Sequence, residues 1–257
     1  MVLIDTHTHL YLNAFDDDRD AMVERAIACG VRYMFLPNID STSVKGMHDL
    51  CDRYPENCFP MMGLHPTSVK DNFEDELRIV QKQLESNTYW AIGETGIDLY
   101  WDKNFYREQV IAFNYQIDLA LLYDIPLVIH ARESFKEIFR VLENRDINGL
   151  TGVFHCFTGN LEEAERAIRL GFMLGIGGVL TYKKSGLDEV VAAVGPEHLI
   201  LETDAPFLPP VPHRGKRNES AYVLHVADKL AEILQIPVSE VGRITTRNAA
   251  TLFNLSI

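Results

Sequence analysis

Basic side chains are scarce in this 257-residue sequence, which has 24 Lys and Arg against 37 Asp and Glu and a formal net charge of −13. Proteins that hold nucleic acid over a broad surface rely on Lys and Arg to neutralise phosphates, so the composition excludes that class of binding protein. A local site stays compatible with this charge, because bound divalent cations can reverse the sign of the field inside a pocket. Any polyanionic substrate would therefore be held at a pocket.

Signals for export or membrane insertion are also missing. The apolar run before the first histidine is only three residues long and the first basic residue is Arg19, which does not fit a signal peptide. No apolar run reaches the length of a transmembrane span. The cysteines lack zinc-finger spacing, and we expect reduced thiols at Cys29, Cys51, Cys58 and Cys156. The sequence predicts a cytoplasmic protein with no membrane partner.

Short apolar runs alternate with amphipathic stretches along the chain, and no linker or low-complexity segment marks a second domain. We therefore expect a single domain over residues 1–257. Nearly all strand candidates are apolar throughout, as in a parallel sheet buried on both faces. They lie at residues 1–5, 31–36, 58–63, 89–93, 127–130, 152–155, 172–176 and 199–202.

Helices are expected between these strands, at residues 16–29, 43–54, 73–85, 104–123, 133–143, 160–171 and 187–194, with two more at 220–234 and 239–253. Asn160 and Glu163 form a capping-box pattern, while Gly30 and Gly171 are typical residues after a helix end. The arrangement predicts a (β/α)8 TIM barrel with the C-terminal helices packed outside. A doubly wound open sheet has similar periodicity, but no G-x-G-x-x-G or Walker loop follows the first strand.

Polar residues gather where the predicted strands end, which is where barrel enzymes place their chemistry. Five of the nine histidines occupy such places, although each alone would more often be structural. Alternation along the first strand puts the two imidazoles of the H-x-H motif on one side, and together the residues indicate a metal site. The strand-end residues are His7, His9, His65, Glu94, His130, His155, Glu202 and Asp204.

Four imidazoles and two carboxylates are too many ligands for one tetrahedral ion, but they suit two ions that share a carboxylate and a water. We predict a binuclear centre bridged by Glu94, with the nucleophile a hydroxide held between two divalent cations. The identity of the metal stays open between Zn²⁺, Mg²⁺ and Mn²⁺. In the predicted division His7, His9 and Asp204 bind one ion, and His130 and His155 bind the other.

Six segments carry a resemblance to a known family: residues 5–10 (DTHTHL), 63–66 (GLHP), 93–98 (GETGID), 130–132 (HAR), 155–159 (HCFTG) and 202–206 (ETDAP). In this order they resemble the TatD family of metal-dependent deoxyribonucleases, which belongs to the amidohydrolase-like barrels, and the likeness reaches the terminal NAATLF segment at 248–253. The resemblance implies hydrolysis of phosphodiester bonds in DNA and the same ligand division, with an unmodified Glu94 as the bridge. One departure is Ser220, where the family usually has proline.

Several residues have two open roles. Asp204 is either a ligand and general base or a ligand only. Arg132 follows ligand His130 by two residues, so a phosphate contact competes with a surface ion pair. His65 is a candidate phosphate contact or leaving-group acid. Glu202 is expected to support a ligand from behind.

The remaining candidates lie in loops or beside ligands. The basic loop of Arg214, Lys216 and Arg217 is a candidate DNA contact or a brace for the barrel. Asp98, Tyr100 and Trp101 follow the bridging glutamate, where they stack an unpaired base or pack over the rim. Alternation predicts that Cys156 points away from the pocket, and Asp5 is expected to hold an imidazole or the bottom of the barrel.

The leading hypothesis is a metal-dependent deoxyribonuclease with DNA as its substrate, acting on single strands or on 3′ ends. The first alternative keeps the binuclear site and changes the substrate to an amide, lactone or other ester, since a fold does not determine a reaction. The second alternative is a non-catalytic metal-binding scaffold, but this sequence has lost none of the expected ligands.

Overall fold

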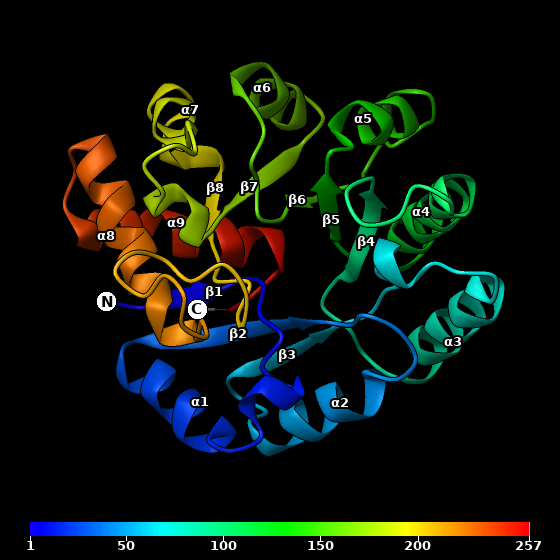
Figure 1. The fold of residues 1–257 in the computed structure, drawn as a ribbon, viewed down its shortest axis with the longest axis horizontal. Helices are drawn as coiled ribbons and strands as arrows, with labels where there is room; N and C mark the ends of the chain where they lie inside the picture. Colours follow the sequence, from blue (N-terminus) through cyan, green and yellow to red (C-terminus); the bar gives the residue numbers. More distant parts are fainter. Residues whose placement is uncertain (257) are drawn as a thin grey trace.

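Eight parallel strands alternate with helices in the computed structural model, which describes residues 1–256 (Figure 1). Neighbouring strands pair in the order β1 to β3 and β4 to β8, and parallel bridges between Thr8 and Ala205 and between Met62 and Ile92 join the two sheets. The chain is therefore a (β/α)8 TIM barrel, as predicted. The strands are β1 (Leu3–Asp5), β2 (Val31–Pro37), β3 (Cys58–Met61), β4 (Ile92–Asp98), β5 (Leu127–Arg132), β6 (Gly152–Phe154), β7 (Phe172–Ile176) and β8 (Leu199–Leu201).

The helices form a ring around the strands (Figure 1). Their ends follow the local signals of the sequence: the capping box of Asn160 and Glu163 is formed, and Gly30 and Gly171 adopt positive φ angles just after α1 and α6. The helices are α1 (Arg19–Ala28), α2 (Val44–Arg53), α3 (Phe73–Ser86), α4 (Tyr106–Tyr123), α5 (Phe135–Glu143), α6 (Leu161–Arg169), α7 (Leu187–Val194), α8 (Val223–Leu234) and α9 (Val238–Leu252). Short 3-10 turns are η1 (Asn13–Phe15), η2 (Pro66–Ser68), η3 (Gly178–Thr181), η4 (Pro196–His198) and η5 (Ser220–Tyr222).

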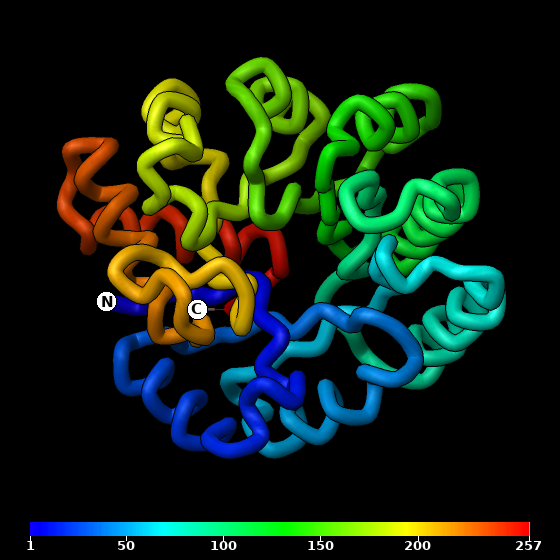
Figure 2. The backbone as a smooth tube through the Cα atoms, in the orientation of Figure 1, coloured from blue at the N-terminus to red at the C-terminus, as the bar shows by residue number. Residues whose placement is uncertain are grey.

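Two apolar cores stabilise the barrel. The larger lies between strands and helices, and the smaller fills the barrel interior with side chains from the strands and from the end of α9. Phe253 stacks on Phe35 in this interior, with ring centroids 4.1 Å apart. Figure 2 shows the red C-terminal segment lying across the ring of strands. The packed interior leaves space for polar chemistry only at the carboxyl ends of the strands.

Most element boundaries shift by one to three residues from the prediction, and two of the differences matter for the site and for the Ser220 departure. Strand β4 covers Ile92–Asp98 rather than residues 89–93, so Glu94 lies inside the strand and Asp98 ends it. The polar sequence of this segment looks like a loop, but its backbone pairs with β5, for example Thr95 with Ile129, and its side chains are buried. The second difference concerns Ser220, where the 3-10 turn η5 comes first and α8 begins at Val223.

No helix within residues 1–256 is both long enough and apolar enough to cross a lipid bilayer. The four cysteines of the described chain are all free thiols.

Candidate metal centre

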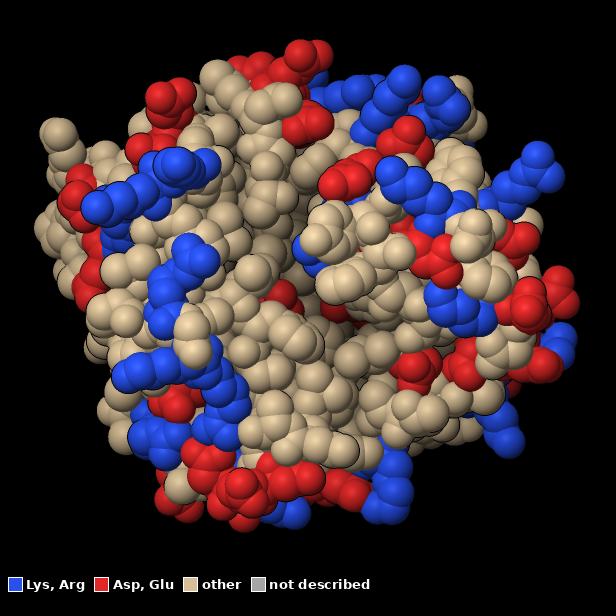
Figure 3. All heavy atoms as spheres, viewed as in Figure 1, with Lys and Arg blue, Asp and Glu red and all other residues tan. Residues whose placement is uncertain are grey.

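A cavity of about 610 Å³ opens at the carboxyl ends of the strands, and Figure 3 shows it as the hollow near the centre of the molecule, with acidic side chains at its floor. Nearly all of the predicted ligands line it, and an apolar rim surrounds them. The lining includes His9, His65, Glu94, Asp98, Trp101, His130, Arg132, His155, Cys156, Val179, Asp204, Phe207 and Leu208.

The buried carboxylate of Glu94 lies at the centre of this cluster. Its Oε1 atom is 2.7 Å from Nδ1 of His130 and 2.9 Å from Nε2 of His155. Nε2 of His65 is 3.1 Å from the same oxygen. One face of Glu94 therefore meets three imidazoles, which come from β5, from the segment after β6 and from the segment after β3.

The second oxygen of Glu94 faces the H-x-H motif. Oε2 lies 3.1 Å from Nε2 of His7 and 3.4 Å from Nε2 of His9, and these two nitrogens are 3.2 Å apart. Asp204, from the segment after β8, places Oδ1 within 3.8 Å of both nitrogens. The structure thus brings all six predicted ligands together around Glu94. The two predicted groups adjoin each other, because the ring of His155 stacks on that of His7 at 3.7 Å and its ligand atom also lies near Asp204.

The donor set fits divalent cations. Burial lowers the pKa of His7 well below its usual value, so its imidazole is neutral and can offer a lone pair. Burial opposes ionisation of Glu94, yet the surrounding imidazoles, His155 foremost, hold its pKa well below the usual range. Burial raises the pKa of Asp204 to about 6, although His155 and His9 lower it. Burial opposes protonation of His130 and His155, but the carboxylates around them raise the pKa of both rings, so a cation bound there must displace protons. Imidazole nitrogens and carboxylate oxygens that converge from several strands are the ligands of zinc and manganese sites.

Hydrogen bonds behind the cluster fix which nitrogen of His9 is free. Burial raises the pKa of Tyr11 well above its usual value, so its hydroxyl keeps its proton and donates it to the carbonyl oxygen of Pro37. The same hydroxyl lies 2.9 Å from Nδ1 of His9 and must therefore accept a proton from it. The proton on Nδ1 leaves Nε2 as the ring nitrogen that can offer a lone pair to a cation beside Glu94.

A carboxylate plays the corresponding part for His130, and a second carboxylate lies near His155. Oδ2 of Asp98 lies 2.8 Å from Nε2 of His130, which turns Nδ1 of that ring toward Glu94. Oε1 of Glu202 lies 3.4 Å from Nδ1 of His155, and it also accepts the backbone N–H of Cys156. Carboxylates in this position orient metal-binding imidazoles and raise their basicity.

His65 has the opposite proton arrangement. Its Nδ1 accepts the backbone N–H of Thr67, which is 3.1 Å away and can only donate. Burial lowers the pKa of His65, so the neutral ring carries its single proton on Nε2 and points that N–H at Glu94. In this arrangement His65 is a hydrogen-bond donor to the site, although its position beside Glu94 and His130 would also suit a ligand.

Replacing Tyr11 with phenylalanine is expected to weaken metal binding by about 10- to 100-fold, as is usual when a partner behind a ligand is lost. The variant releases Nδ1 of His9 and leaves the Pro37 carbonyl without its donor. Metal retained after dialysis against a graded chelator measures the effect, and full activity should return at high metal concentration. Tyr115→Phe is the matched control, since it removes a hydroxyl that contacts only Gln81 on the surface. Equal metal affinity of the two variants would contradict the role of Tyr11.

The structure places one of the two arginines predicted to bind substrate in the cavity and the other outside it. Arg132 lines the cavity, and its guanidinium carbon lies 3.8 Å from the centre of the Tyr100 ring and 5.3 Å from that of Trp101. Arg214 lies outside the cavity lining and stacks on Tyr182, at 3.9 Å.

Arg217 pairs with Asp18 through both nitrogens, at 2.7 Å each, and braces the loop after β8 against the start of α1.

One prediction about an individual residue was wrong, and another was right only in part. Cys156 lines the cavity instead of pointing away, because β6 ends at Phe154 and the φ angle of Cys156 is +43°, so strand alternation no longer applies. Asp5 contacts no imidazole ring, but its carboxylate accepts the backbone N–H of His7, at 3.5 Å. Its carboxylate accepts the backbone N–H and the hydroxyl of Thr203, at 2.9 and 2.6 Å, and so positions the segment that carries Asp204.

Sequence reasoning missed the role of Tyr11 altogether and placed Asp98 in a loop. The signal for Tyr11 was present, since it continues the alternation of His7 and His9 by two more residues. No comparable signal marks Asp98, whose partner His130 is 32 residues away in the chain.

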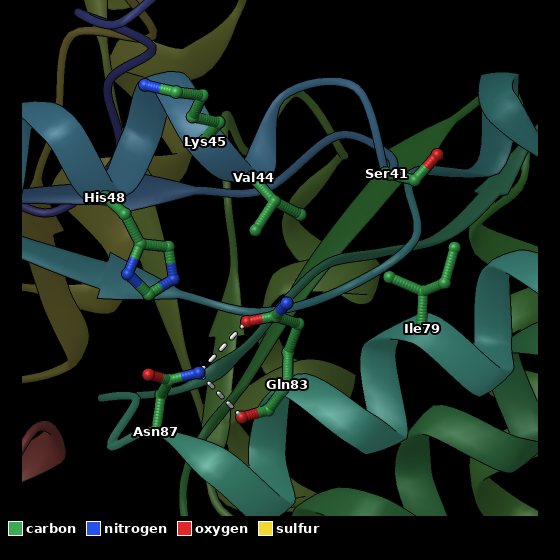
Figure 4. A pocket seen from close by; sticks show the side chains of 7 residues that line it. All are labelled: Ser41, Val44, Lys45, His48, Ile79, Gln83 and Asn87. Atoms are coloured by element: carbon green, nitrogen blue, oxygen red, sulfur yellow. Dashed lines mark hydrogen bonds between the residues drawn. The ribbon is translucent and has the colours of Figure 1, made fainter.

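A second hollow, of about 460 Å³, lies between α2 and α3 (Figure 4). Gln83 reaches into it and accepts two hydrogen bonds from the amide of Asn87. None of the described residues that line it is a carboxylate, so it has no ligand set of the kind found at the barrel mouth.

Comparisons with known proteins agree with this geometry. The sequence pattern of the family described as TatD related DNase matches residues 4–254. The chain is 34% identical to the uncharacterized metal-dependent hydrolase YabD of Bacillus subtilis, over 99% of this chain and 100% of that protein. It is 30% identical to the protein named 3′-5′ ssDNA/RNA exonuclease TatD of Erwinia tasmaniensis, over 98% of this chain and 100% of that one. The crystal structure of YjjV, a TatD homologue from Escherichia coli, superposes with a TM-score of 0.92 at 31% identity, covering 99% of this chain and 98% of that chain. The chain therefore belongs to the TatD family of metal-dependent hydrolases.

Proposed function

We propose that the protein is a nuclease that hydrolyses phosphodiester bonds of single-stranded DNA, working from an end, with two divalent cations in the barrel mouth. The observation that carries the proposal is the division of imidazoles between the two oxygens of Glu94, with Arg132 and exposed aromatic rings at the entrance. The name of the Erwinia relative describes an exonuclease for single-stranded DNA and RNA, which supports the same class of substrate.

Each group of ligands would hold one ion, and Glu94 would contact both. Bound divalent cations supply Lewis-acid polarisation of a phosphate oxygen and lower the pKa of water toward 7. Zn²⁺, Mg²⁺ and Mn²⁺ are the candidates, and metal analysis of the untreated protein distinguishes them. In this proposal the groups follow the two oxygens of Glu94, with His7, His9 and Asp204 on one side and His130 and His155 on the other.

The remaining residues of the mouth would handle the substrate. Asp204 accepts the proton of the attacking water. The guanidinium of Arg132 grips a phosphate oxygen. His65 would reach a phosphate oxygen or the leaving group only if its Nε2–H turned away from Glu94. Trp101 is 67% exposed at the rim, so its ring is free to stack an unpaired base.

The proposal is tested with a 5′-labelled single strand of about 20 nucleotides and each of the three metals in turn. The expected result is a ladder of products shortened from one end, absent when a chelator replaces the metal. A circular single strand serves as the control, because an enzyme that works from ends leaves it intact. Turnover of a lactone, an amide or a simple ester, with no cleavage of DNA under any metal, would instead support the alternative hydrolase.

Arg132→Ala is expected to lower kcat/KM for DNA by about 10- to 100-fold. This is the rate effect that corresponds to the free energy of a hydrogen bond to a charged group. The loss should appear mainly in KM, because the guanidinium binds phosphate before and during the reaction. Arg132→Lys keeps the charge and removes the planar fork, so it should recover only part of the loss. Steady-state kinetics on the labelled strand measure both variants, and unchanged KM and kcat in Arg132→Ala would remove this residue from the site.

A further inference from the structure

The wall of the cavity opposite Arg132 is built from two loops that are joined to each other. The backbone N–H of Val211 donates to the hydroxyl of Thr181, at 2.9 Å, and the hydroxyl of Tyr182 donates to the carbonyl oxygen of Pro209, also at 2.9 Å. Both loops line the cavity, the first through Val179 and the second through Phe207 and Leu208. The two segments therefore form one surface that runs outward from the metal centre.

Four cations lie on this surface, which we call the basic tract: Lys183, Lys184, Arg214 and Lys216. All four are exposed, and no carboxylate of residues 1–256 forms an ion pair with any of them. Arg214 stacks on Tyr182, directly before the two lysines, so cations of both loops are adjacent. Figure 3 shows Lys and Arg side chains gathered to the left of the hollow, over the segments that Figure 1 colours yellow and orange.

The cations of the tract differ from the arginines beside them in having no carboxylate partner. Arg25 and Arg217 lie beside it, but Glu219 and Asp18 neutralise them at 2.7 Å. The chain as a whole carries a formal charge of −13. In a chain with this excess of negative charge, a group of unpaired cations next to the cavity that holds the predicted ligands favours a polyanion that extends beyond the cavity.

We infer that the basic tract holds the phosphate backbone of a single-stranded polynucleotide outside the cavity, several nucleotides from the one at the metal centre. This inference rests on the proposed function for its substrate, and it adds a length requirement. Strands long enough to reach the tract bind more tightly than strands that only fill the cavity. Binding through the tract has little base preference and is sensitive to salt, because it neutralises phosphates.

The test measures binding without hydrolysis, by fluorescence anisotropy of labelled oligothymidylates of 3 and 15 nucleotides in the presence of EDTA. The test variant is Lys183→Gln with Lys184→Gln and Lys216→Gln. The control variant removes three exposed, unpaired cations elsewhere: Lys82→Gln with Arg140→Gln and Arg247→Gln, on α3, α5 and α9. Both variants change the net charge equally, so long-range effects cancel in their comparison.

The test variant is expected to bind the 15-nucleotide strand about tenfold more weakly than the control variant, and its plot of log Kd against log salt should be shallower by about 2, at roughly 0.7 for each lost phosphate contact. The 3-nucleotide strand should bind the two variants alike. Equal affinity of both variants for the long strand overturns the tract. If the test variant loses binding but the wild-type protein cleaves no DNA, the basic tract is supported and the proposed nuclease function is rejected. If the wild-type protein cleaves DNA but the two variants bind the long strand equally, the nuclease function is supported and the basic tract is rejected.

Discussion

Glu94→Gln is expected to lower DNA hydrolysis by about 10³-fold or more and to reduce the bound metal from two ions to one or none. The carboxylate lies within 3.4 Å of all five imidazoles of the cluster, and its two oxygens face different groups of them. Glutamine has nearly the same shape but no charge. Only its side-chain oxygen can accept a hydrogen bond or bind a cation, because its amide nitrogen can only donate. A metal centre that contributes several kcal/mol to the transition state accounts for a rate loss of this size.

Kinetics on the labelled strand and metal analysis after gel filtration measure the two effects separately. Glu85→Gln is the matched control, since it changes an exposed carboxylate on α3 that contacts only Gln81. Thermal unfolding of both variants shows whether the fold survives the change. A Glu94→Gln protein that keeps two ions would contradict the bridging role, whatever happens to its activity.

The strand-end histidines could be found from sequence because parallel strands in a barrel end on the same side. His7 and His9 lie beyond β1, and His155 lies beyond β6, so a correct list of strands was sufficient to bring them together. Their grouping around Glu94 followed from ligand chemistry and did not need an exact boundary for β4. This is why an error of three residues at the start of that strand left the candidate site intact.

The partners behind the ligands were not accessible in the same way. Asp98 becomes a partner of His130 only when β4 and β5 lie in the register that pairs residue 98 with residue 132. Cys156 changes direction because of a single positive φ angle after the strand. Such contacts depend on the distance between side chains of different strands, which hydrophobic periodicity does not encode.

The basic tract illustrates the same limit. The sequence shows a basic loop at residues 214–217, but its cations have different partners in the structure. Arg217 forms an ion pair with Asp18. Arg214 lies against Tyr182, which is 32 residues earlier in the chain. The lysines that follow Tyr182 looked unremarkable in the chain. Only the packing of η3 against the loop after β8 assembles them into one surface.

Asp204→Asn is expected to lower kcat by about 10²- to 10⁴-fold while two ions remain bound at saturating metal, which is the range for loss of a general base. Asparagine keeps a side-chain oxygen that can bind a cation, but it cannot take a proton from water. The change is compatible with the backbone, because Asp204 has a φ angle of +56° and asparagine is among the residues that tolerate this region. The backbone N–H that donates to the carbonyl of His7 is unaffected.

The response to added metal separates the two roles left open for Asp204. If the carboxylate is a ligand only, high metal concentration restores the activity of Asp204→Asn, as it should for Tyr11→Phe, whose defect is in affinity alone. If Asp204 also accepts the proton, the rate stays low at every metal concentration although two ions are present. Titration of both variants with Mn²⁺, followed by metal analysis and by cleavage of the labelled strand, distinguishes these outcomes. We expect the second, because Asp204 is the one ligand whose oxygen lies more than 3.5 Å from every nitrogen of its group and so is placed to face a water as well as an ion.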